Sequence, residues 1–509
     1  MNPPKHPREG ALLATIFLLN GIEFLQGGMI TFGAGPIIGE IGASPEEFSL
    51  VTAVYAVVAI AAISQQRWLI ERMGWRHFVQ ASVAVFIIGA TICGTSSSFP
   101  QFVVGRVVMA LAGGPFLTTS RVMVNLIPPS PRRFRGILAY AGGLAFCNGI
   151  APWLASIAIS HDHWPAIFVI LAVLAAVAAV LGTIALPNEL TPVEQRSHSH
   201  PLVVLLMAGG AFLSLYTLQR ASYDFYANAV PLLLAILVGV GALLYFARHQ
   251  YHHERPLLAL KRLMVTRYVV GMATFTLGYI VLGANNYMLP VLMQGGLGFP
   301  WGVIGQVQSA GLIVAVPTFA IMAMVLKKNQ SAKKFYVTGF ALLTVSGLLM
   351  LRLNSEANLW TDVWPAIAVF GAFITPVMVT TALHSFMDLQ GDEVAFANGQ
   401  QLKNMLSQFG VAAGVAGAAL GLQWRNSEHV SVLLRHFNGE DPAFSQLAGR
   451  LTEQFTASHG AQAAQVAVAT LAQQLYQQAT LLSCLDYFGF LAALGLAGAL
   501  LMSVQRVLK

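Results

Sequence analysis

The sequence contains few charged residues, since Asp, Glu, Lys and Arg make up only 10% of its 509 residues, against about 25% in an average soluble domain. It also has only three cysteines, each inside an apolar run, which excludes a disulfide framework and a zinc or iron–sulfur site. Scarce charge together with 56% hydrophobic residues excludes a soluble globular protein. The net charge of +7 comes from basic residues in short loops between apolar segments, so we expect a lipid bilayer and no nucleic acid as partner.

Long apolar runs dominate the rest of the sequence. A helix that crosses a bilayer needs about 20 mostly apolar residues, and fourteen segments meet this requirement. We therefore expect an all-α integral membrane protein with 14 transmembrane helices. The segments are 11–36, 48–70, 78–97, 101–127, 136–159, 164–186, 201–219, 229–247, 268–290, 303–326, 335–351, 363–386, 402–424 and 479–504.

Basic residues indicate which loops face the cytoplasm, where Lys and Arg accumulate. With the N-terminus inside, 21 of the 28 Lys and Arg residues lie on or near the cytoplasmic side, and five lie outside. This bias predicts a multi-pass protein with both termini in the cytoplasm. Most connections are short, but the stretch 423–478 is polar and contains a helix-like run from Pro442 to Tyr476. This stretch is either a docking surface outside the membrane or a solvated hairpin that only joins two helices.

Four charged side chains stand out among those within or at the edge of predicted crossings. A charge in hydrocarbon costs about 2.5–3.5 kcal/mol even on the lenient insertion scale, so such a residue usually has a function or a partner. Glu23 lies in the middle of the first crossing, Arg106 and Arg121 lie in one helix, the fourth, and Asp486 begins the last. Glu23 and Arg106 are either functional or a buried structural pair, whereas Arg121 and Asp486 can each reach a nearby interface.

Proton coupling requires a carboxyl group that gains and loses its proton near working pH. Burial disfavours the charged form of such a group and a nearby Arg favours it, so we expect Glu23, Arg106 and Asp486 to be the proton-coupling candidates, with Glu23 as the main carboxylate. His384 either binds a proton or substrate or hydrogen-bonds a neighbour. The stretch 249–253 has a metal-like spacing of histidines but no Cys or Asp beside it, so we expect a basic patch and no metal site.

Three motifs, in order along the chain, carry a resemblance to a known family. They are Arg106-Val107-Val108-Met109-Ala110 leading through Gly114-Pro115 to Pro128-Pro129, Gly149-Ile150-Ala151-Pro152-Trp153-Leu154-Ala155 followed by His163-Trp164, and Phe396-Ala397-Asn398-Gly399. With its fourteen predicted crossings, the chain resembles from end to end the fourteen-helix drug:proton antiporters of the major facilitator superfamily, of the EmrB and QacA type. The resemblance implies that Arg106 takes part in proton transfer and that Gly149, Ala151 and Pro152 form the antiporter motif of the fifth helix.

Two motifs of that family are altered in this sequence. The loop between helices 2 and 3, normally Gly-x-Leu-x-Asp-Arg-x-Gly-Arg-Lys, reads Arg67-Trp68-Leu69-Ile70-Glu71-Arg72-Met73-Gly74-Trp75-Arg76. We assign Glu71, Arg72, Gly74 and Arg76 to this conformational motif. The helix 1 signature Leu-Asp-x-Thr-Ile-Val-Asn has become Ile22-Glu23-Phe24-Leu25-Gln26-Gly27-Gly28, which keeps the acid but loses the Thr and Asn. We therefore expect an atypical substrate.

The resemblance also implies an arrangement of six, two and six helices. The domains are then an N-terminal six-helix bundle over 1–186, two inserted linker helices over 187–267 and a C-terminal six-helix bundle over 268–509. Further implications are a location in the bacterial inner membrane and no cofactor other than the proton gradient. A periplasmic adaptor and an outer-membrane channel are the implied partners, through the outer loop 423–478.

Together these features predict a proton-coupled secondary transporter, not an enzyme, that exports an amphipathic small organic compound by alternating access. A drug, siderophore, fatty acid or metabolite fits equally well. The alternatives are a proton-coupled importer (symporter) of a small solute, an integral-membrane enzyme, for which no catalytic constellation is seen in the helices, and a non-transporting receptor, against which Glu23 and Arg106 argue. The expected substrate-binding residues mix aromatic and amide side chains: Gln26, Tyr55, Tyr140, Asn148, Tyr279, Asn285, Asn286 and Tyr287.

Overall fold

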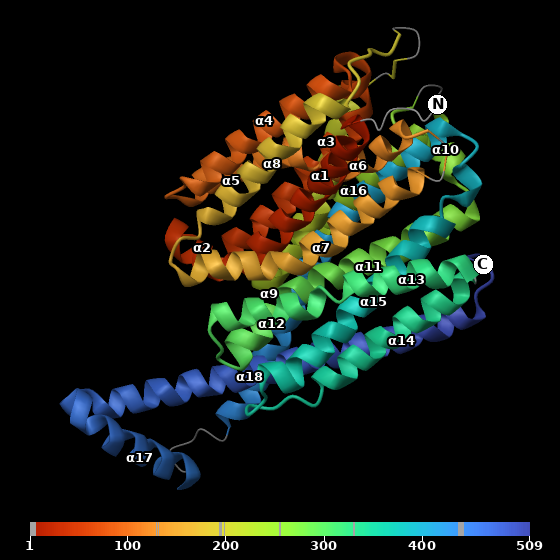
Figure 1. The fold of residues 1–509 in the computed structure, drawn as a ribbon. Coiled ribbons are helices and arrows are strands. Elements are labelled where there is room, and N and C mark those ends of the chain that lie inside the picture. Colours follow the sequence, from red (N-terminus) through yellow and green to blue (C-terminus); the bar gives the residue numbers. More distant parts are fainter. Residues whose placement is uncertain are drawn as a thin grey trace.

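The computed structural model describes residues 7–128, 130, 132–192, 196–197, 199–253, 256–328, 331–435 and 442–508. Within these residues every regular element is a helix. The long helices lie side by side and run between two ends of the molecule (Figure 1).

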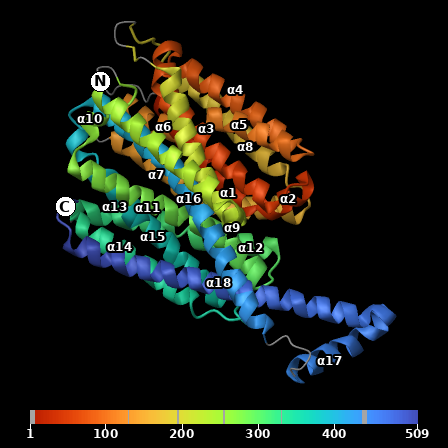
Figure 2. The same ribbon diagram turned by 180° about the vertical axis from the view of Figure 1, so that it is seen from behind.

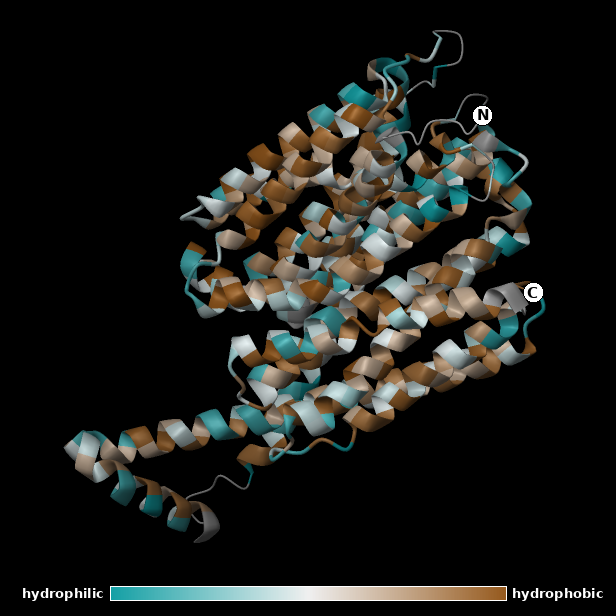
Figure 3. Cartoon of the chain, in the orientation of Figure 1, coloured by the Kyte–Doolittle hydropathy of each residue, from teal (hydrophilic) through white to brown (hydrophobic). Residues whose placement is uncertain are grey.

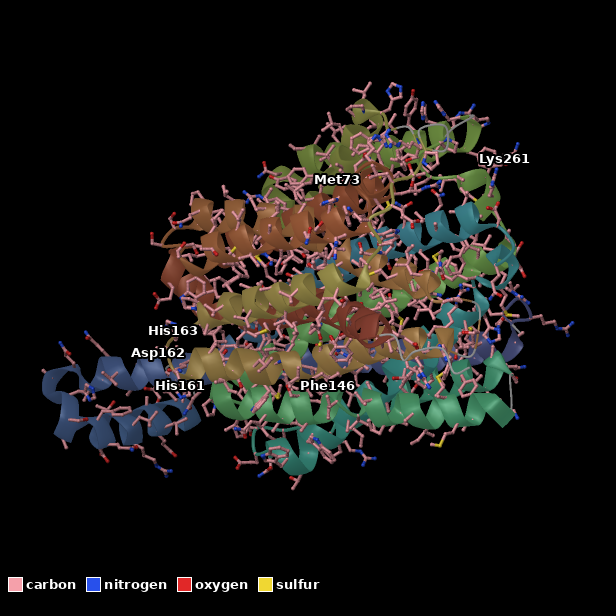
Figure 4. The ribbon with its side chains drawn as sticks, turned by 45° about the horizontal axis from the view of Figure 1, so that its top comes forward. Met73, Phe146, His161, Asp162, His163 and Lys261 are labelled. Atoms are coloured by element: carbon pink, nitrogen blue, oxygen red, sulfur yellow. The ribbon has the colours of Figure 1, made fainter. Side chains whose placement is uncertain are left out.

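The two ends of the molecule carry different parts of the chain. We call the end that holds the N- and C-termini the termini end, and the opposite end, from which α17 (Pro442–His459) projects, the hairpin end (Figure 1). Figure 4 places Lys261 at the termini end and His161, Asp162 and His163 at the hairpin end.

The first part of the chain forms the first six predicted crossings, and the fourth of them is built from two helices. A short helix over 34–41 follows the first crossing after Gly33. Gly114-Pro115 separates the two helices of the fourth, because a proline ring disrupts the helical hydrogen bonds before it. Arg106 and Arg121 therefore lie on two consecutive helices within the single apolar span Phe99–Leu126, which forms the predicted fourth crossing. The helices are α1 (Pro7–Phe32), α2 (Ala34–Ile41), α3 (Pro45–Met73), α4 (Trp75–Gly94), α5 (Phe99–Gly113), α6 (Phe116–Met123), α7 (Arg133–Ser160) and α8 (Ala166–Ala185).

The two inserted crossings follow as one long bent element, α9 (Pro201–His252). The backbone of Asn228 leaves the helical region, with φ −127° and ψ 31°. Pro231 lies three residues further on, where its ring crowds the carbonyl of the preceding turn. The apolar spans on either side of this bend, 201–221 and 228–252, match the two predicted crossings.

The second part of the chain contains the remaining helices. One of them, α16, carries several residues of the site described below. It begins where the side chain of Asp392 accepts hydrogen bonds from the N–H groups of Val394 and Ala395. The Ala395 N–H and the Arg262 guanidinium, 2.8 Å away, lower the pKa of the Asp392 carboxyl below its usual value. The helices are α10 (Leu260–Leu263), α11 (Thr266–Pro290), α12 (Trp301–Leu312), α13 (Ala315–Lys328), α14 (Ala332–Met350), α15 (Trp364–His384), α16 (Glu393–Leu434), α17 and α18 (Ala463–Val504).

The number of crossings agrees with the apolar pattern. Thirteen stretches of the described chain are long and apolar enough to cross a membrane, and the remaining predicted crossing, 335–351, coincides with the 19-residue helix α14. Apolar residues cover much of the outside of the bundle (Figure 3). On α8, for example, Val169, Val173, Val177 and Val180 are exposed, and their spacing of three or four residues places them on one face, as expected for contact with lipid.

The predicted outer connection is mostly helical. α16 continues to Leu434, and α18 begins at Ala463, well before the predicted start at 479. α17 packs on α18, and both helices extend beyond the bundle (Figure 2). The prediction that Asp486 begins the last helix was therefore wrong, because α18 already runs for more than 20 residues before it. Residues 436–441 of this connection lie outside the described residues.

Candidate functional site

Glu23 lies on α1 and is only 6% exposed. Tyr55 on α3 donates a hydrogen bond from its hydroxyl to Glu23 Oε2 at 3.0 Å. Gln408 on α16 donates from Nε2 to Glu23 Oε1 at 2.7 Å. The carboxyl group is therefore held by the first part of the chain through Tyr55 and by the second part through Gln408.

Arg106 on α5 lies close to this carboxyl group but does not form an ion pair with it. It is 4% exposed, and its Nη1 donates to Gln26 Oε1 at 2.8 Å. Its guanidinium carbon lies 4.1 Å from the ring centroid of Tyr55, which gives a cation–π contact. Arg106 thus reaches Glu23 through Tyr55, so that a change in the charge of Glu23 is felt by Arg106 without a direct bond.

A cavity of about 320 Å³ opens from Glu23 toward the hairpin end, and we call it the hairpin-side cavity. Its wall is mostly apolar, with a few polar groups, as in many small-molecule sites. Six of the expected substrate-binding residues line it together with Glu23 and Arg106: Gln26, Tyr55, Asn148, Tyr279, Asn286 and Tyr287. Asn285 and Tyr140 do not line it; Asn285 is buried and accepts a hydrogen bond from Tyr487 at 3.3 Å.

Asp486, the other proton-coupling candidate, lies outside the residues that line the cavity. Its carboxylate accepts a hydrogen bond from Arg425 Nε at 2.7 Å and is 2.7 Å from His429 Nε2. Both partners lie on α16, and the Asp486 side chain is 39% exposed. The geometry is that of a bridge between α16 and α18 near the hairpin end.

Two residues of α16 were not among the predicted site residues. Gln408 binds Glu23, and Lys403 is 4% exposed although it was counted among the charges near the cytoplasmic side. The prediction failed because the crossing was expected to begin at 402, whereas α16 begins at Glu393. Helix-start signals were present at Asp392, a residue type that favours the N-cap position.

The loop motif between α3 and α4 binds the segment that leads to α9. Glu71 accepts hydrogen bonds from Arg67 Nε at 2.7 Å and from the N–H and hydroxyl of Ser197 at 2.5 and 2.6 Å. Arg72 donates to the carbonyl of Ser197 at 3.1 Å. Gly74 has a positive φ of 77°, which suits glycine, at the turn between the two helices.

Arg76 completes the motif by donating to the carbonyl of Thr183 on α8. The four predicted residues of this loop therefore lie together at the termini end and connect α3, α8 and the segment before α9.

The antiporter-like motif of α7 packs against α12. A Cβ on Gly149 would lie 3.0 Å from the Cα of Ile313, which leaves no room for a larger residue without a shift. Pro152 lies inside α7, and the following N–H, that of Trp153, donates to the hydroxyl of Ser309 on α12 at 2.8 Å. Ala151 is fully buried. This motif therefore joins the first part of the chain to the second.

Comparison with known proteins decides the family. The model of the Major Facilitator Superfamily matches residues 16–415. The chain belongs to the Major Facilitator Superfamily. It is thus a membrane transporter and not an enzyme, and the predicted all-α membrane architecture of this superfamily is confirmed.

Two relatives in sequence, from Escherichia coli and Enterobacter, share the name of a multidrug resistance protein. The chain is 25% identical over 402 residues to the putative multidrug resistance protein MdtD of Escherichia coli O1:K1 / APEC, covering 77% of this chain and 82% of the relative. It is 24% identical over 399 residues to the protein of the same name from Enterobacter sp. strain 638, covering 77% and 81%. These relatives support the resemblance to drug:proton antiporters.

Solved structures share the fold at low sequence identity. A bacterial homolog of the human lysosomal transporter Spinster, inward-facing and unoccupied, aligns with a TM-score of 0.60 and 14% identity over 98% of this chain and 97% of that chain. A POT family transporter in complex with 5-aminolevulinic acid aligns with a TM-score of 0.59 and 13% identity over 97% and 95%. At such identities these structures support the fold alone.

Proposed function

We propose that this transporter exports an amphipathic small organic compound in exchange for protons, by alternating access. The hydrogen bond from Gln408 to Glu23 carries this proposal, because it joins the two parts of the chain at a buried acid that opens onto a cavity. The names of the multidrug resistance relatives agree with export. No cofactor other than the proton gradient is needed.

Protonation of Glu23 changes the contact between α1 and α16. A charged carboxylate accepts a stronger hydrogen bond from the Gln408 amide than a neutral carboxyl group does. Proton binding therefore weakens the link between the two parts of the chain, and loss of the proton strengthens it. The proton therefore has a different affinity for the conformation in which α1 and α16 are joined than for the one in which they are apart. A ligand shifts the populations of two conformations only through such a difference in affinity.

The substrate binds in the hairpin-side cavity and competes with the proton for Glu23. The six aromatic and amide residues in its wall suit an organic compound with apolar surface and a few polar groups. Metabolite profiling of the medium from deletion and overexpression strains identifies the compound. We expect one or more compounds to be depleted in the deletion strain and enriched on overexpression; accumulation inside the overexpressing cells instead would indicate the importer.

We further propose that the protein lies in the bacterial inner membrane with the termini end in the cytoplasm, from the excess of Lys and Arg there. The native cysteines Cys93, Cys147 and Cys484 are buried, so that introduced ones can be labelled selectively. Ser458→Cys on α17 is expected to react with an impermeant thiol reagent in intact cells, and Ser331→Cys, before α14, only after the membrane is opened. The reverse pattern would contradict this orientation.

The hairpin of α17 and α18 is the proposed docking site for a periplasmic adaptor and, through it, an outer-membrane channel. It projects beyond the bundle (Figure 2), and its faces expose large apolar side chains such as Leu447, Val468 and Tyr476. A chain shortened over residues 440–470 is expected to insert and bind substrate but to lose export from cells. Unchanged export by the shortened chain would contradict the proposal that an adaptor binds here.

A further inference from the structure

A second cavity, of about 380 Å³, lies at the termini end and is separated from the first by a layer of packed side chains. We call it the termini-side cavity. Along α16, Gln401 lines the termini-side cavity and Ser407 lines the hairpin-side cavity. Lys403 lies between them, so it belongs to the barrier that a transported molecule has to pass.

Hydrogen bonds from α16 close this barrier. Gln401 donates to the carbonyl of Ile63 at 3.1 Å, and Asn404 donates to the hydroxyl of Thr118 at 2.7 Å. Ile63 and Thr118 belong to the first part of the chain, so the barrier is made by the same two parts that meet at Glu23. It opens when α16 separates from α3 and α6.

Lys403 is buried in this barrier among aromatic rings. Its Nζ lies 3.4 Å from the hydroxyl of Tyr140, 5.7 Å from the ring centroid of Tyr140 and 5.4 Å from that of Phe275. These contacts satisfy only part of an ammonium group, which has three donors. Lys403 forms no ion pair with any Asp or Glu of the described chain.

Arg121 on α6 adds a second positive charge to the barrier. Its guanidinium carbon lies 5.2 Å from the ring centroid of Phe396 on α16, and its Nη1 is buried without a hydrogen-bond partner. Arg121 therefore faces the same helix, α16, that carries Lys403, and like charges on facing elements repel each other. Like Lys403, Arg121 forms no ion pair within the described residues.

Buried Lys403 and half-buried Arg121 have no carboxylate partner within the described residues, which is costly at this depth, and aromatic rings offset only part of the cost. An anionic group that enters the barrier removes the repulsion and supplies acceptors to both cations. Glu23, one layer further toward the hairpin end, offers the opposite charge. Gln408, which binds Glu23, and Lys403 are separated by a rise of about 7.5 Å along α16.

We propose that Lys403 and Arg121 bind an anionic group of the transported compound, and that the substrate is an amphipathic zwitterion whose cationic group replaces the proton at Glu23. The anionic group is a carboxylate, sulfonate or phosphate. This inference rests on the proposed function for the role of Glu23, while the anion site depends on the barrier alone. A simple anion would be repelled by deprotonated Glu23, and a simple cation would be repelled by Lys403 and Arg121. A zwitterion can place its cationic group at Glu23 and its anionic group at the two cations.

Equilibrium binding to the full chain in nanodiscs tests the inference with three radiolabelled probes of equal length: 8-aminooctanoate, octanoate and octylamine. Binding to empty nanodiscs is subtracted. Wild-type protein is expected to prefer 8-aminooctanoate over both others. Lys403→Gln is expected to lower the affinity for 8-aminooctanoate and octanoate by at least about tenfold, through the loss of a charge-assisted hydrogen bond. The affinity for octylamine is expected to stay the same or to rise, because the variant removes one of the charges that repel a cation.

Matched variants separate binding from packing. Lys403→Arg keeps the charge and is expected to retain most of the affinity, and Lys334→Gln removes an exposed lysine and is expected to change nothing. Unchanged affinity for 8-aminooctanoate in folded Lys403→Gln and Arg121→Gln would overturn the anion site. If neither variant folds, the affinities of the wild-type protein for the three probes decide. Binding of octylamine as tight as that of 8-aminooctanoate, or tighter, would overturn the proposal.

The binding measurement needs no proton gradient, so it is independent of the test of the proposed function. Loss of binding in Lys403→Gln with no proton-driven export of any compound would leave the anion site standing and reject proton coupling. Proton-driven export that is insensitive to Lys403→Gln, with unchanged binding, would reject the anion site alone.

Discussion

Glu23 and Asp486 are both acids in crossing helices, yet their surroundings differ. Glu23 is 6% exposed, and its hydrogen-bond partners include the neutral side chains of Tyr55, Gln408 and Gln26. The side chain of Asp486 is 39% exposed and contacts Arg425 and His429 directly. A directly paired acid keeps its charge, whereas burial favours the protonated form of an acid that has only neutral hydrogen-bond partners, which is the property that the proposed exchange of proton and substrate at Glu23 requires. The two acids therefore differ in burial and in hydrogen-bond partners, and this difference favours Glu23 over Asp486 as the candidate for proton coupling.

The largest effect is expected from replacing Glu23. Glu23→Gln keeps the shape and the neutral form of the side chain but removes the exchangeable proton. Uptake of the exported compound into proteoliposomes under an imposed pH gradient is expected to fall to the background of empty liposomes, while counterflow without a gradient continues. Asp486→Asn is the matched control and keeps gradient-driven uptake. Uptake by Glu23→Gln at the wild-type rate would move the coupling role elsewhere, with Asp486 next to examine.

Removing Arg106 is expected to shift the pH dependence of the same transport. Arg106→Ala takes away the positive charge that favours deprotonated Glu23, so the pH profile of substrate binding moves to higher pH by about one unit. Arg106→Lys, which keeps the charge, is expected to shift it less. Binding curves at a series of pH values measure the effect, and superimposed profiles for wild type and Arg106→Ala would show that the two residues are independent.

Gln408 gives a smaller and more specific effect. Gln408→Leu removes a hydrogen bond to a carboxylate, worth about 1.5–3 kcal/mol, so the proton-driven rate is expected to fall roughly tenfold. The neighbouring Gln400→Leu, which does not contact Glu23 in the described structure, serves as control. Equal rates for wild type and Gln408→Leu, at all pH values, would show that the contact across the two parts is not used.

The smallest effect is expected at Asp486. Asp486→Asn weakens a partly exposed bridge to Arg425 and His429, and such surface pairs contribute about 1 kcal/mol or less. Thermal unfolding in detergent is expected to occur a little earlier, with an unchanged pH profile of transport. A changed profile would place Asp486 in the coupling path and remove the contrast with Glu23.

The sequence predicts the crossings well because apolar length is a strong signal. It also predicts Glu23 as a buried acid, and Tyr55 and Gln26 as residues of the cavity wall, because polar residues in apolar helices are rare. It does not predict which way a helix is turned about its axis, so Tyr140 and Asn285 were expected in the cavity but lie outside its wall. Lys403 was missed because the start of α16 was placed about nine residues too late, which put a buried cation at the cytoplasmic end of the crossing.

The breaks within crossings were harder to predict. The break between α5 and α6 lies at Gly114-Pro115, between Arg106 and Arg121, and the proline makes this break predictable from the sequence. The early start of α18 is different, because no glycine or proline lies between Ala463 and Phe488 to mark a boundary, and the polar residues of this stretch were interpreted as a loop. A helix that continues beyond the membrane leaves no apolar signal in its outer part.

Proton release on substrate binding tests the central claim, that Glu23 is the group whose proton is exchanged. The exported compound is added at saturating concentration to purified protein in weakly buffered solution with a pH-sensitive dye. Wild-type protein and Asp486→Asn are expected to release protons to the same extent, and Glu23→Gln is expected to bind the compound without releasing any. Proton release by Glu23→Gln equal to that of wild type would contradict the account.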